Sequence, residues 1–189
     1  MSIDINNKIE EHHRLVKNTF DKYTDKAIEI ANEIIKVYKK GGKVLVAGNG
    51  GSASDAQHIA TELVNKLYKK SKALSAIALT SDSAVVTAWS NDEGYDFVFS
   101  RQIEAHGKTG DIFIGISTSG NSKNIINAVD KANEIGLITI SLLGRDGGKL
   151  KGMCNHEIIV NGDHVARIQE VHEIIYHIIL EIVEEEFLE

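Results

Sequence analysis

Two side chains that commonly take part in proton transfer or metal binding lie four residues apart in the segment SDAQHIATEL. They are His58 and Glu62, and on a helix the i, i+4 spacing places them on one face. This arrangement suits two metal ligands, or a base beside a polarising group. The structural alternative is an ordinary solvated His–Glu pair on a helix surface.

A second set of polar side chains recurs at steps of four near the C-terminus. Gln169, Glu173 and His177 follow one another at i+4 in a segment whose other positions are strongly apolar, namely Ile168, Val171, Ile175, Ile178, Ile179 and Ile182. Polar groups on such a buried helix need partners, so they either line a cavity or join a network. His172 and Tyr176 lie close to the same side of this helix, and the simpler interpretation is that they are core residues.

The segment before His58 contains a glycine loop. GNGGSAS, residues 48–54, follows the apolar run VLVA and fits the GxGxxA form of the dinucleotide-binding pattern. The acidic residue expected about 20 positions later is missing, because LSAIALT ends in Thr80. A phosphate-binding GxxxxGK[ST] loop is absent as well. The glycine loop alone is therefore weak evidence for a nucleotide.

A second loop, STSGNS at residues 117–122, carries four hydroxyl residues in six positions and has no basic residue before Lys123. Hydroxyl groups and backbone N–H groups at the start of a helix can bind an anion, and a phosphate monoester fits that description. The structural alternative is an ordinary cluster of helix N-cap residues.

The remaining pattern predicts the elements that position these residues. Apolar periodicity changes repeatedly between strand-like and helix-like, and no proline interrupts it. We expect strands at residues 44–47, 74–79, 111–117, 137–143 and 157–160, and helices at about 9–40, 54–67, 83–89, 97–105, 122–135 and 164–187. Alternating strands and helices indicate an α/β fold, a doubly wound parallel sheet of about five strands flanked by helices, in three layers.

Both loops then lie beyond the carboxyl ends of strands, where such sheets bind ligands. We expect one domain over residues 1–189, with an N-terminal helical extension of about 1–42 and an α/β core of about 43–189.

Charge and composition limit the partners. The 21 Lys and Arg residues are outnumbered by 27 Asp and Glu residues, which gives a net charge of −6 and predicts no nucleic-acid partner. No segment is as long and apolar as a membrane span, and the N-terminus lacks a signal-peptide core. Cys154 is the only cysteine. We therefore expect a cytoplasmic protein without a membrane association.

Taken together, five segments resemble the phosphosugar-isomerase domain of the SIS type and, within it, the phosphoheptose isomerases. They are GNGGSASDAQHIATEL, SNDEGYDFVFSRQ, GDIFIGISTSGNSKNI, LLGRDGGKL and ARIQEVHEIIYHI. The resemblance covers nearly the whole chain. It implies the SIS fold and an enzyme that isomerises sedoheptulose 7-phosphate.

The resemblance also implies roles for individual residues. The phosphate would be held by Ser117, Thr118, Ser119 and Ser122, and the sugar would be contacted by Asn49, Gly50, Gly51, Ser52, Asn91 and Asp92, together with Glu62 and Gln169. The metal-binding positions of the family fall on His58, Glu62, Gln169 and His177, and the implied cofactor is one Zn²⁺ per subunit. The catalytic pair would be Glu62 and His177.

Two sequence differences within the family bear on activity. A relative with nearly the same loops, the initiator-associating protein, is a binding module that lacks the Glu and the His at the positions of Glu62 and His177. This chain keeps both residues, which favours catalysis. Ala166 stands where some catalytic relatives have Asp, so any role of that carboxylate must be absent or filled elsewhere.

The implied reaction moves a proton between C1 and C2 of the sugar through an enediol, which yields D-glycero-D-manno-heptose 7-phosphate, the first step of nucleotide-activated heptose biosynthesis. It needs a base near the carbon, an acid at the carbonyl oxygen and charge stabilisation there, but no organic cofactor. Glu62 is expected to be the base, His177 the acid–base partner and Zn²⁺ the Lewis acid. These roles compete, because a ligated Glu or His carries protons poorly. Either the metal is partly displaced during turnover or it is chiefly structural.

Gln169 and His177 are eight residues apart, about 12 Å along a straight helix. Both can reach one ion only if they extend toward each other, which predicts a crowded site between helices. We expect a second chain to close this site at a subunit interface. The resemblance implies a homotetramer.

Three other functions remain open from the sequence. The chain can be a non-catalytic phosphosugar sensor or protein-binding module on the same fold, an SIS isomerase of a six-carbon substrate, or a dinucleotide oxidoreductase. Turnover of sedoheptulose 7-phosphate against fructose 6-phosphate separates the first two from the expected enzyme, and binding of NAD(H) tests the third.

Overall fold

The computed structural model describes residues 4–189 and has a five-stranded sheet in the order β2-β1-β3-β4-β5, with every neighbouring pair parallel. The strands are β1 (Val44–Gly48), β2 (Ala76–Ala78), β3 (Ile112–Ser117), β4 (Ile138–Gly144) and β5 (His156–Val160). The expected doubly wound α/β fold is confirmed, and its strand order is the flavodoxin-like one.

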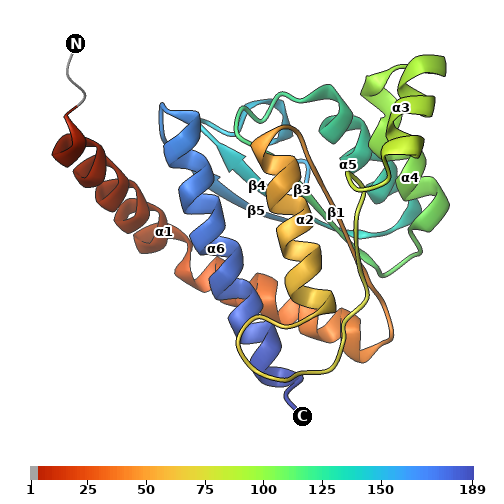
Figure 1. Ribbon diagram of the computed structural model, residues 1–189, viewed down its shortest axis with the longest axis horizontal. Helices are drawn as coiled ribbons and strands as arrows, with labels where there is room; N and C mark the ends of the chain where they lie inside the picture. Colours follow the sequence, from red (N-terminus) through yellow and green to blue (C-terminus); the bar gives the residue numbers. More distant parts are fainter. Residues whose placement is uncertain (1–3) are drawn as a thin grey trace.

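Within residues 4–189, six α-helices and two short 3₁₀ helices connect and cover the strands (Figure 1). The α-helices are α1 (Ile5–Lys39), α2 (Gly51–Val64), α3 (Ser83–Asp92), α4 (Val98–His106), α5 (Lys123–Ile135) and α6 (Val165–Glu186), and the 3₁₀ helices are η1 (Tyr95–Phe97) and η2 (Gly148–Leu150). Within the described residues, no helix is both long enough and apolar enough to cross a bilayer.

The strands are buried on both faces, so alternate side chains of each strand enter two separate cores. Val44 and Val46 of β1 pack with α1, α2 and α6, whereas Leu45 and Ala47 pack with α4 and α5. The helices α1, α2 and α6 therefore cover one face of the sheet and α4 and α5 the other. The C-terminal half of α1 shares the first core through residues such as Ile30 and Ile34.

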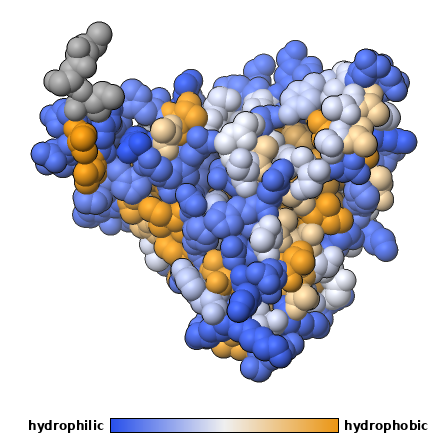
Figure 2. Space-filling view, in the orientation of Figure 1, coloured by the Kyte–Doolittle hydropathy of each residue, from blue (hydrophilic) through white to orange (hydrophobic). Residues whose placement is uncertain are grey.

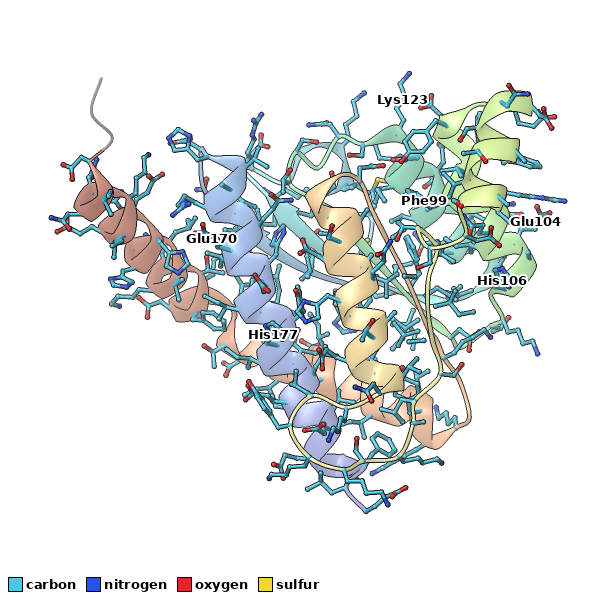
Figure 3. The ribbon with its side chains drawn as sticks, viewed as in Figure 1. Phe99, Glu104, His106, Lys123, Glu170 and His177 are labelled. Carbon is cyan, nitrogen blue, oxygen red and sulfur yellow. The ribbon has the colours of Figure 1, made fainter. Side chains whose placement is uncertain are left out.

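The N-terminal half of α1 extends beyond the rest of the molecule (Figure 1). Figure 2 shows apolar atoms on this projecting end, where the side chains of Ile5 and Ile9 are exposed. His12 on this half is 2.8 Å from Glu170 of α6 through Nδ1 and Oε2, and Figure 3 shows Glu170 on the side of α6 that faces α1. The projection is therefore anchored to α6 by a polar contact.

Several expected boundaries differ from the structure. The expected strand at 74–79 is shortened to Ala76–Ala78, because it lies at the sheet edge and pairs only with β1. The expected helix at 54–67 begins earlier, at Gly51, and ends at Val64. Gly50 has a φ of 57°, a left-handed conformation that lets the chain turn from β1 into α2 within two residues. Half of the predicted first loop is therefore the first turn of α2.

The other boundary differences are smaller. The N-terminal helix starts at Ile5 rather than residue 9, since the Asp4 side chain caps it by accepting from the N–H of Asn7 at 3.2 Å. The helix expected at 97–105 is divided into η1 and α4, and the helix expected at 83–89 continues to Asp92. The remaining elements are placed within one or two residues of expectation.

Candidate active site

The two loops singled out in the sequence emerge side by side. Gly48 at the end of β1 pairs with Ile116 of β3, one residue before the loop that starts at Ser117. In the order 2-1-3, the chain reverses its direction across the sheet between β1 and β3, and ligands bind at such a switch point. The candidate site therefore occupies the position that the fold favours for a ligand.

A reciprocal amide pair joins the first loop to the start of α5. Asn49 Nδ2 donates to Asn124 Oδ1, and Asn124 Nδ2 donates to Asn49 Oδ1, both at 2.9 Å. The Tyr95 hydroxyl donates to the same Asn49 oxygen at 2.8 Å. The side chain of Asn49, expected to contact the sugar, thus also holds the first loop against the start of α5.

Two hydroxyls of the second loop contact each other rather than the helix behind them. Ser117 Oγ and Ser122 Oγ are 3.0 Å apart, and Ser119 Oγ accepts from the N–H of Asn121 at 3.1 Å. Ser122 is the N-cap residue of α5, yet its side chain makes no capping hydrogen bond. This geometry disfavours the simple N-cap interpretation and leaves the N-terminus of α5 able to bind an anion.

A hollow of about 500 Å³ opens beside this loop. Its lining includes Ser119, Asn121, Arg145 and Asn161, which are polar or cationic, together with Asp146 and Asp163. Arg145 is the one non-glycine residue of the described chain with a positive φ, at 57°. Sequence reasoning missed Arg145, although GRDGG marks a turn directly after β4.

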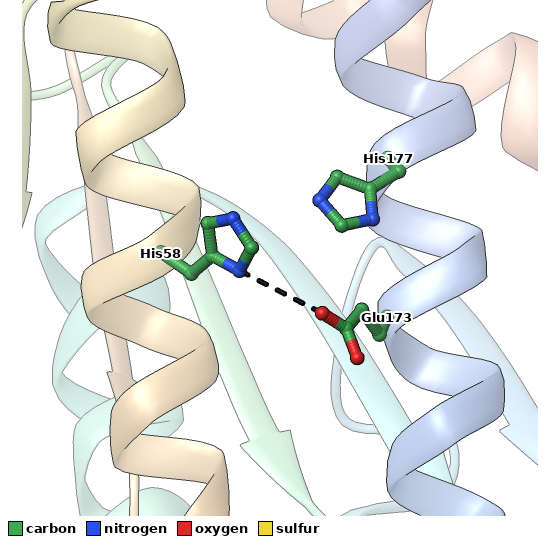
Figure 4. A group of neighbouring side chains, drawn as sticks. All are labelled: His58, Glu173 and His177. Carbon is green, nitrogen blue, oxygen red and sulfur yellow. Dashed lines mark ion pairs between the residues drawn. The ribbon is translucent and has the colours of Figure 1, made fainter. Parts of the chain in front are cut away.

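The chemistry-bearing side chains of α2 and α6 converge from opposite sides (Figure 4). His58 Nε2 is 3.2 Å from Glu62 Oε1, so the expected i, i+4 pair is formed within α2. The His58 ring faces that of His177 with centroids 4.9 Å apart at an interplanar angle of 79°. His177 lies near the middle of α6 (Figure 3). The structure thus brings together His58, Glu62 and His177.

Glu173 also belongs to this group. Its Oε1 is 3.8 Å from His58 Nδ1, and His58, Glu173 and His177 each offer one ligand atom such that all three atoms lie within 4.8 Å of one another. The Tyr176 hydroxyl is 3.0 Å from the same His58 Nδ1. The sequence left two interpretations for the polar residues of α6, which could line a cavity or join a network. Glu173 and His177 join a network with His58 where α6 contacts α2.

The Gln169 side chain lies away from the two histidines, at the start of α2. A β-carbon added to Gly51 would lie 2.1 Å from Gln169 Nε2, so the Gln169 side chain packs directly on the first turn of α2. His58 is seven residues further along α2, about 10 Å at 1.5 Å per residue. The Gln169 amide is thus positioned beside the first loop, where Gly50, Gly51 and Ser52 lie, whereas the histidines meet near the middle of the helices.

Asn91 and Asp92 lie at the end of α3, which has no buried residues. Asn91 Nδ2 donates to Asp92 Oδ1 at 2.9 Å, and both side chains are exposed. Figure 1 shows α3 at the edge of the molecule, on the α4 and α5 side of the sheet. Among residues 4–189, no hydrogen bond or ion pair joins Asn91 or Asp92 to the histidines.

Asp55 is a site residue that sequence reasoning missed. Its Oδ2 is buried and has no hydrogen-bond partner among the described residues. Desolvation and the nearby Glu173 carboxylate raise the pKa of Asp55 to about 6, against a smaller lowering by His58. Its position three residues before His58, on the same helix face, was the available signal.

His172 and Tyr176 prove to be different kinds of residue. His172 is fully buried, its Nε2 is 2.9 Å from the carbonyl oxygen of Leu143, and burial lowers its pKa to about 4. It is a neutral core imidazole. Tyr176 is buried too, but its hydroxyl reaches His58. The core interpretation therefore holds for His172, whereas Tyr176 also belongs to the site.

The site is not closed within one chain. The side chain of His58 is 39% exposed and that of Glu173 is 50% exposed, whereas that of Glu62 is only 16% exposed. His58 and Glu173 are therefore open to solvent in a single chain, whereas Glu62 is largely shielded.

Comparison with known proteins gives a consistent result. Residues 9–144 match the SIS domain family. The phosphoheptose isomerase of Clostridium acetobutylicum is 48% identical to this chain over 182 residues, which are 96% of this chain and 92% of the relative.

Two solved structures are also similar over nearly their whole length. The phosphoheptose isomerase from Neisseria gonorrhoeae has a TM-score of 0.90 and 38% identity, with coverage of 96% of this chain and 97% of that one. The phosphoheptose isomerase from Francisella tularensis has a TM-score of 0.92 and 36% identity, and 96% of each chain is covered.

Proposed function

The chain belongs to the SIS domain family and, within it, to the phosphoheptose isomerases, and from this we infer that it is an enzyme that isomerises sedoheptulose 7-phosphate. The resemblance seen in the sequence is confirmed. The product is D-glycero-D-manno-heptose 7-phosphate, which would serve nucleotide-activated heptose biosynthesis. The observation that carries this function in the structure is the meeting of His58, Glu62 and His177 at the contact between α2 and α6.

The substrate phosphate is assigned to the second loop. The hydroxyls of Ser117 and Ser122 are adjacent and Ser122 leaves α5 uncapped, which supports an anion-binding role for the loop residues Ser117, Thr118, Ser119 and Ser122. The sugar is assigned to the first loop, Asn49 to Ser52, with Gln169 behind Gly51. Asn91 and Asp92 are assigned to the sugar by the resemblance to the phosphoheptose isomerases alone, because they lie on α3, which has no buried residues.

The proton transfer is assigned to Glu62 and His177. Glu62 is better shielded than Glu173 and lies on the Nε2 side of His58, which suits a base that takes the proton from the sugar carbon. His177 approaches from α6 and can exchange a proton with the substrate oxygens. His58 lies between them and orients Glu62 through its ring nitrogen.

A divalent ion such as Zn²⁺, one per subunit, fits the donors of this site. Two imidazoles and carboxylates are ligands that zinc prefers, and the sequence predicts His58, Glu62, Gln169 and His177. The two imidazoles are the members that the geometry supports most directly. When bound, the ion would act as a Lewis acid at the carbonyl oxygen.

The assembly, location and domain organisation follow the same proposal. A homotetramer with active sites at subunit interfaces would cover the exposed side of His58 and Glu173. The core that α1 shares with α2 and α6 supports one SIS domain over the whole chain. We assign the enzyme to the cytoplasm, in keeping with its metabolic substrate.

The alternative of a non-catalytic phosphosugar sensor or protein-binding module is not favoured, because Glu62 and His177 are both present and both in the site. The test is to incubate the full-length protein with sedoheptulose 7-phosphate, with and without added zinc, and to analyse the products by NMR. Formation of the aldose phosphate is expected, with fructose 6-phosphate turned over more slowly. Binding of the phosphate without any aldose product would contradict the proposal.

A further inference from the structure

Tyr95 connects two groups of residues that are assigned to the sugar. It belongs to η1, three residues after Asp92 at the end of α3, and its hydroxyl donates to Asn49 Oδ1 in the first loop at 2.8 Å. No other hydrogen bond or ion pair of residues 4–189 joins residues 83–97 to the first loop. Tyr95 is therefore the polar link between Asn49 and the segment that carries Asn91 and Asp92.

The hydrogen bonds of Asn49 determine how its amide is oriented. Oδ1 accepts from both Asn124 and Tyr95, which uses both of its lone pairs. Nδ2 donates one N–H to Asn124 Oδ1, and its second N–H has no protein partner among the described residues. Asn124 is only 4% exposed, so its own amide needs this pairing. Asn49 is thus held with one N–H available to an oxygen of the sugar.

The neighbours of η1 place the Tyr95 side chain. Asn127 Nδ2 of α5 donates to the backbone oxygen of Asp96 at 2.8 Å, and the Lys123 ammonium lies 3.6 Å from the Asp96 carboxylate. The Tyr95 ring packs edge-on against the buried ring of Phe99 in α4, with centroids 6.2 Å apart. The position of the hydroxyl therefore depends on α4 and α5, which are part of the packed core.

The helix before η1 is held much less firmly. α3 has no buried residues, and Gly94, with a φ of 96°, provides the left-handed turn between α3 and η1. A helix with so little buried surface opens locally at a low cost in free energy. The hydrogen bond from Tyr95 to Asn49 therefore limits how far the end of α3, with Asn91 and Asp92, can move from the first loop.

We propose that Tyr95 is a positioning residue for the sugar, because its hydroxyl orients the Asn49 amide and holds the end of α3 beside the first loop. The proposal rests on the proposed isomerase function for the identity of the sugar. Tyr95 acts through Asn49, Asn91 and Asp92 and does not touch the reacting carbons. The phosphate is assigned to the second loop, so the effect of Tyr95 is confined to the sugar part of the substrate.

A competing explanation is that a half-exposed tyrosine makes an incidental hydrogen bond. Tyr95→Phe separates the two, because it keeps the ring against Phe99 and removes only the hydroxyl. Loss of one neutral hydrogen bond is expected to raise KM for sedoheptulose 7-phosphate about three- to tenfold, with kcat changed less than about threefold. The inhibition constant of inorganic phosphate, a competitive inhibitor for the same loop, should stay within about twofold of the unmodified enzyme.

The matched control is Tyr23→Phe. Tyr23 packs on the core from α1, and its hydroxyl has no hydrogen-bond partner among residues 4–189. This variant should change neither KM nor the inhibition by phosphate. If Tyr95→Phe leaves KM unchanged, or weakens the binding of substrate and inorganic phosphate equally, the proposal is overturned, because the second pattern is that of a general structural disturbance.

A double substitution tests whether Tyr95 acts through Asn49. In the background of Asn49→Ala, Tyr95→Phe is expected to raise KM no further, and additive losses would overturn the proposal. Asn49→Ala removes the partner of the buried Asn124 amide, so its folding is checked by circular dichroism. If it does not fold, the hydrogen-exchange measurement on Tyr95→Phe decides.

Hydrogen exchange measures the hold on α3 without any turnover. Tyr95→Phe should accelerate exchange of the backbone amides of residues 83–97, whereas Tyr23→Phe should not. Faster exchange in a protein without isomerase activity would overturn the proposed function and leave the hold on α3 standing. Isomerase activity with unchanged exchange and unchanged KM in Tyr95→Phe would overturn the role of Tyr95 and leave the proposed function standing.

Discussion

His58 on α2 and His177 on α6 face each other with ring centroids 4.9 Å apart, although they are far apart in the sequence. Nothing local joins them. They meet because α2 and α6 bury their apolar sides, including Ile59 and Ile175, in the same core on one face of the sheet. The proposed catalytic geometry therefore depends on the packing of two helices, and substitutions can separate effects on chemistry from effects on that packing.

Replacing the proposed base tests the chemistry. Glu62→Gln keeps the size of the side chain and an oxygen that accepts from His58 Nε2, but it cannot take up a proton from the sugar. General base catalysis contributes about 10²–10⁴-fold to a rate, so we expect kcat to fall by at least a hundredfold. Calorimetry should show substrate affinity within about threefold of the unmodified enzyme. Retained turnover would show that another group is the base.

Ser122→Ala separates phosphate binding from helix capping. Ser122 makes no capping hydrogen bond, and its hydroxyl lies 3.0 Å from Ser117 Oγ. Removal of a cap costs about 1 kcal/mol of stability, so little change in the free energy of unfolding is expected here. Loss of one hydrogen bond to a charged phosphate costs about 1.5–3 kcal/mol, or roughly ten- to a hundredfold in substrate affinity. The reverse pattern, lower stability with unchanged affinity, would support the capping interpretation.

The contact between Gly51 and Gln169 is tested by a pair of substitutions. A β-carbon at position 51 would lie 2.1 Å from Gln169 Nε2. Because the end of a glutamine side chain can move, Gly51→Ala should fold but displace the amide from the first loop. We expect substrate affinity to fall at least tenfold, with a smaller change in melting temperature. In the background of Gln169→Ala, Gly51→Ala should have little further effect, and additive losses would contradict the proposed contact.

The fold and the pairing within α2 were predictable because both depend on local patterns. Apolar runs alternating with helical periodicity determine the number and type of the elements, and His58 and Glu62 share a face of any helix that contains them. The adjacency of the two loops also follows, since parallel strands present their carboxyl ends at one edge.

The position of α6 along α2 was not predictable. Gln169, Glu173 and His177 follow one another at steps of four, so the sequence does not distinguish their positions on the helix face. Which of them faces His58 depends on how far α6 is shifted along α2. That shift is set by packing in the shared core, not by spacing. The burial of Asp55 and the pairing of Asn49 with Asn124 likewise depend on residues distant in the sequence.

The last prediction concerns the loop after α2, which a single carboxylate ties to α6. The oxygens of Glu184 accept from the backbone N–H groups of Leu67, Tyr68 and Lys69 at 2.6–3.1 Å. Burial raises the pKa of Glu184, but these N–H donors lower it by more, so the pKa lies below the ordinary value for glutamate. The folded protein therefore holds this carboxylate in its charged form more strongly than the unfolded chain does.

A lowered folded pKa stabilises the protein above the pKa of the unfolded chain, and the gain is lost as pH falls through the folded value. Glu184→Gln should therefore reduce the free energy of unfolding at pH 7 by about 1–3 kcal/mol, and this deficit should shrink below about pH 4. Urea denaturation at both pH values measures it. Glu185→Gln is the matched control, since Glu185 is exposed and pairs only with the Lys69 ammonium among the described contacts. A deficit that is equal in both variants, or that does not depend on pH, would show that the backbone contacts of Glu184 do not hold the loop.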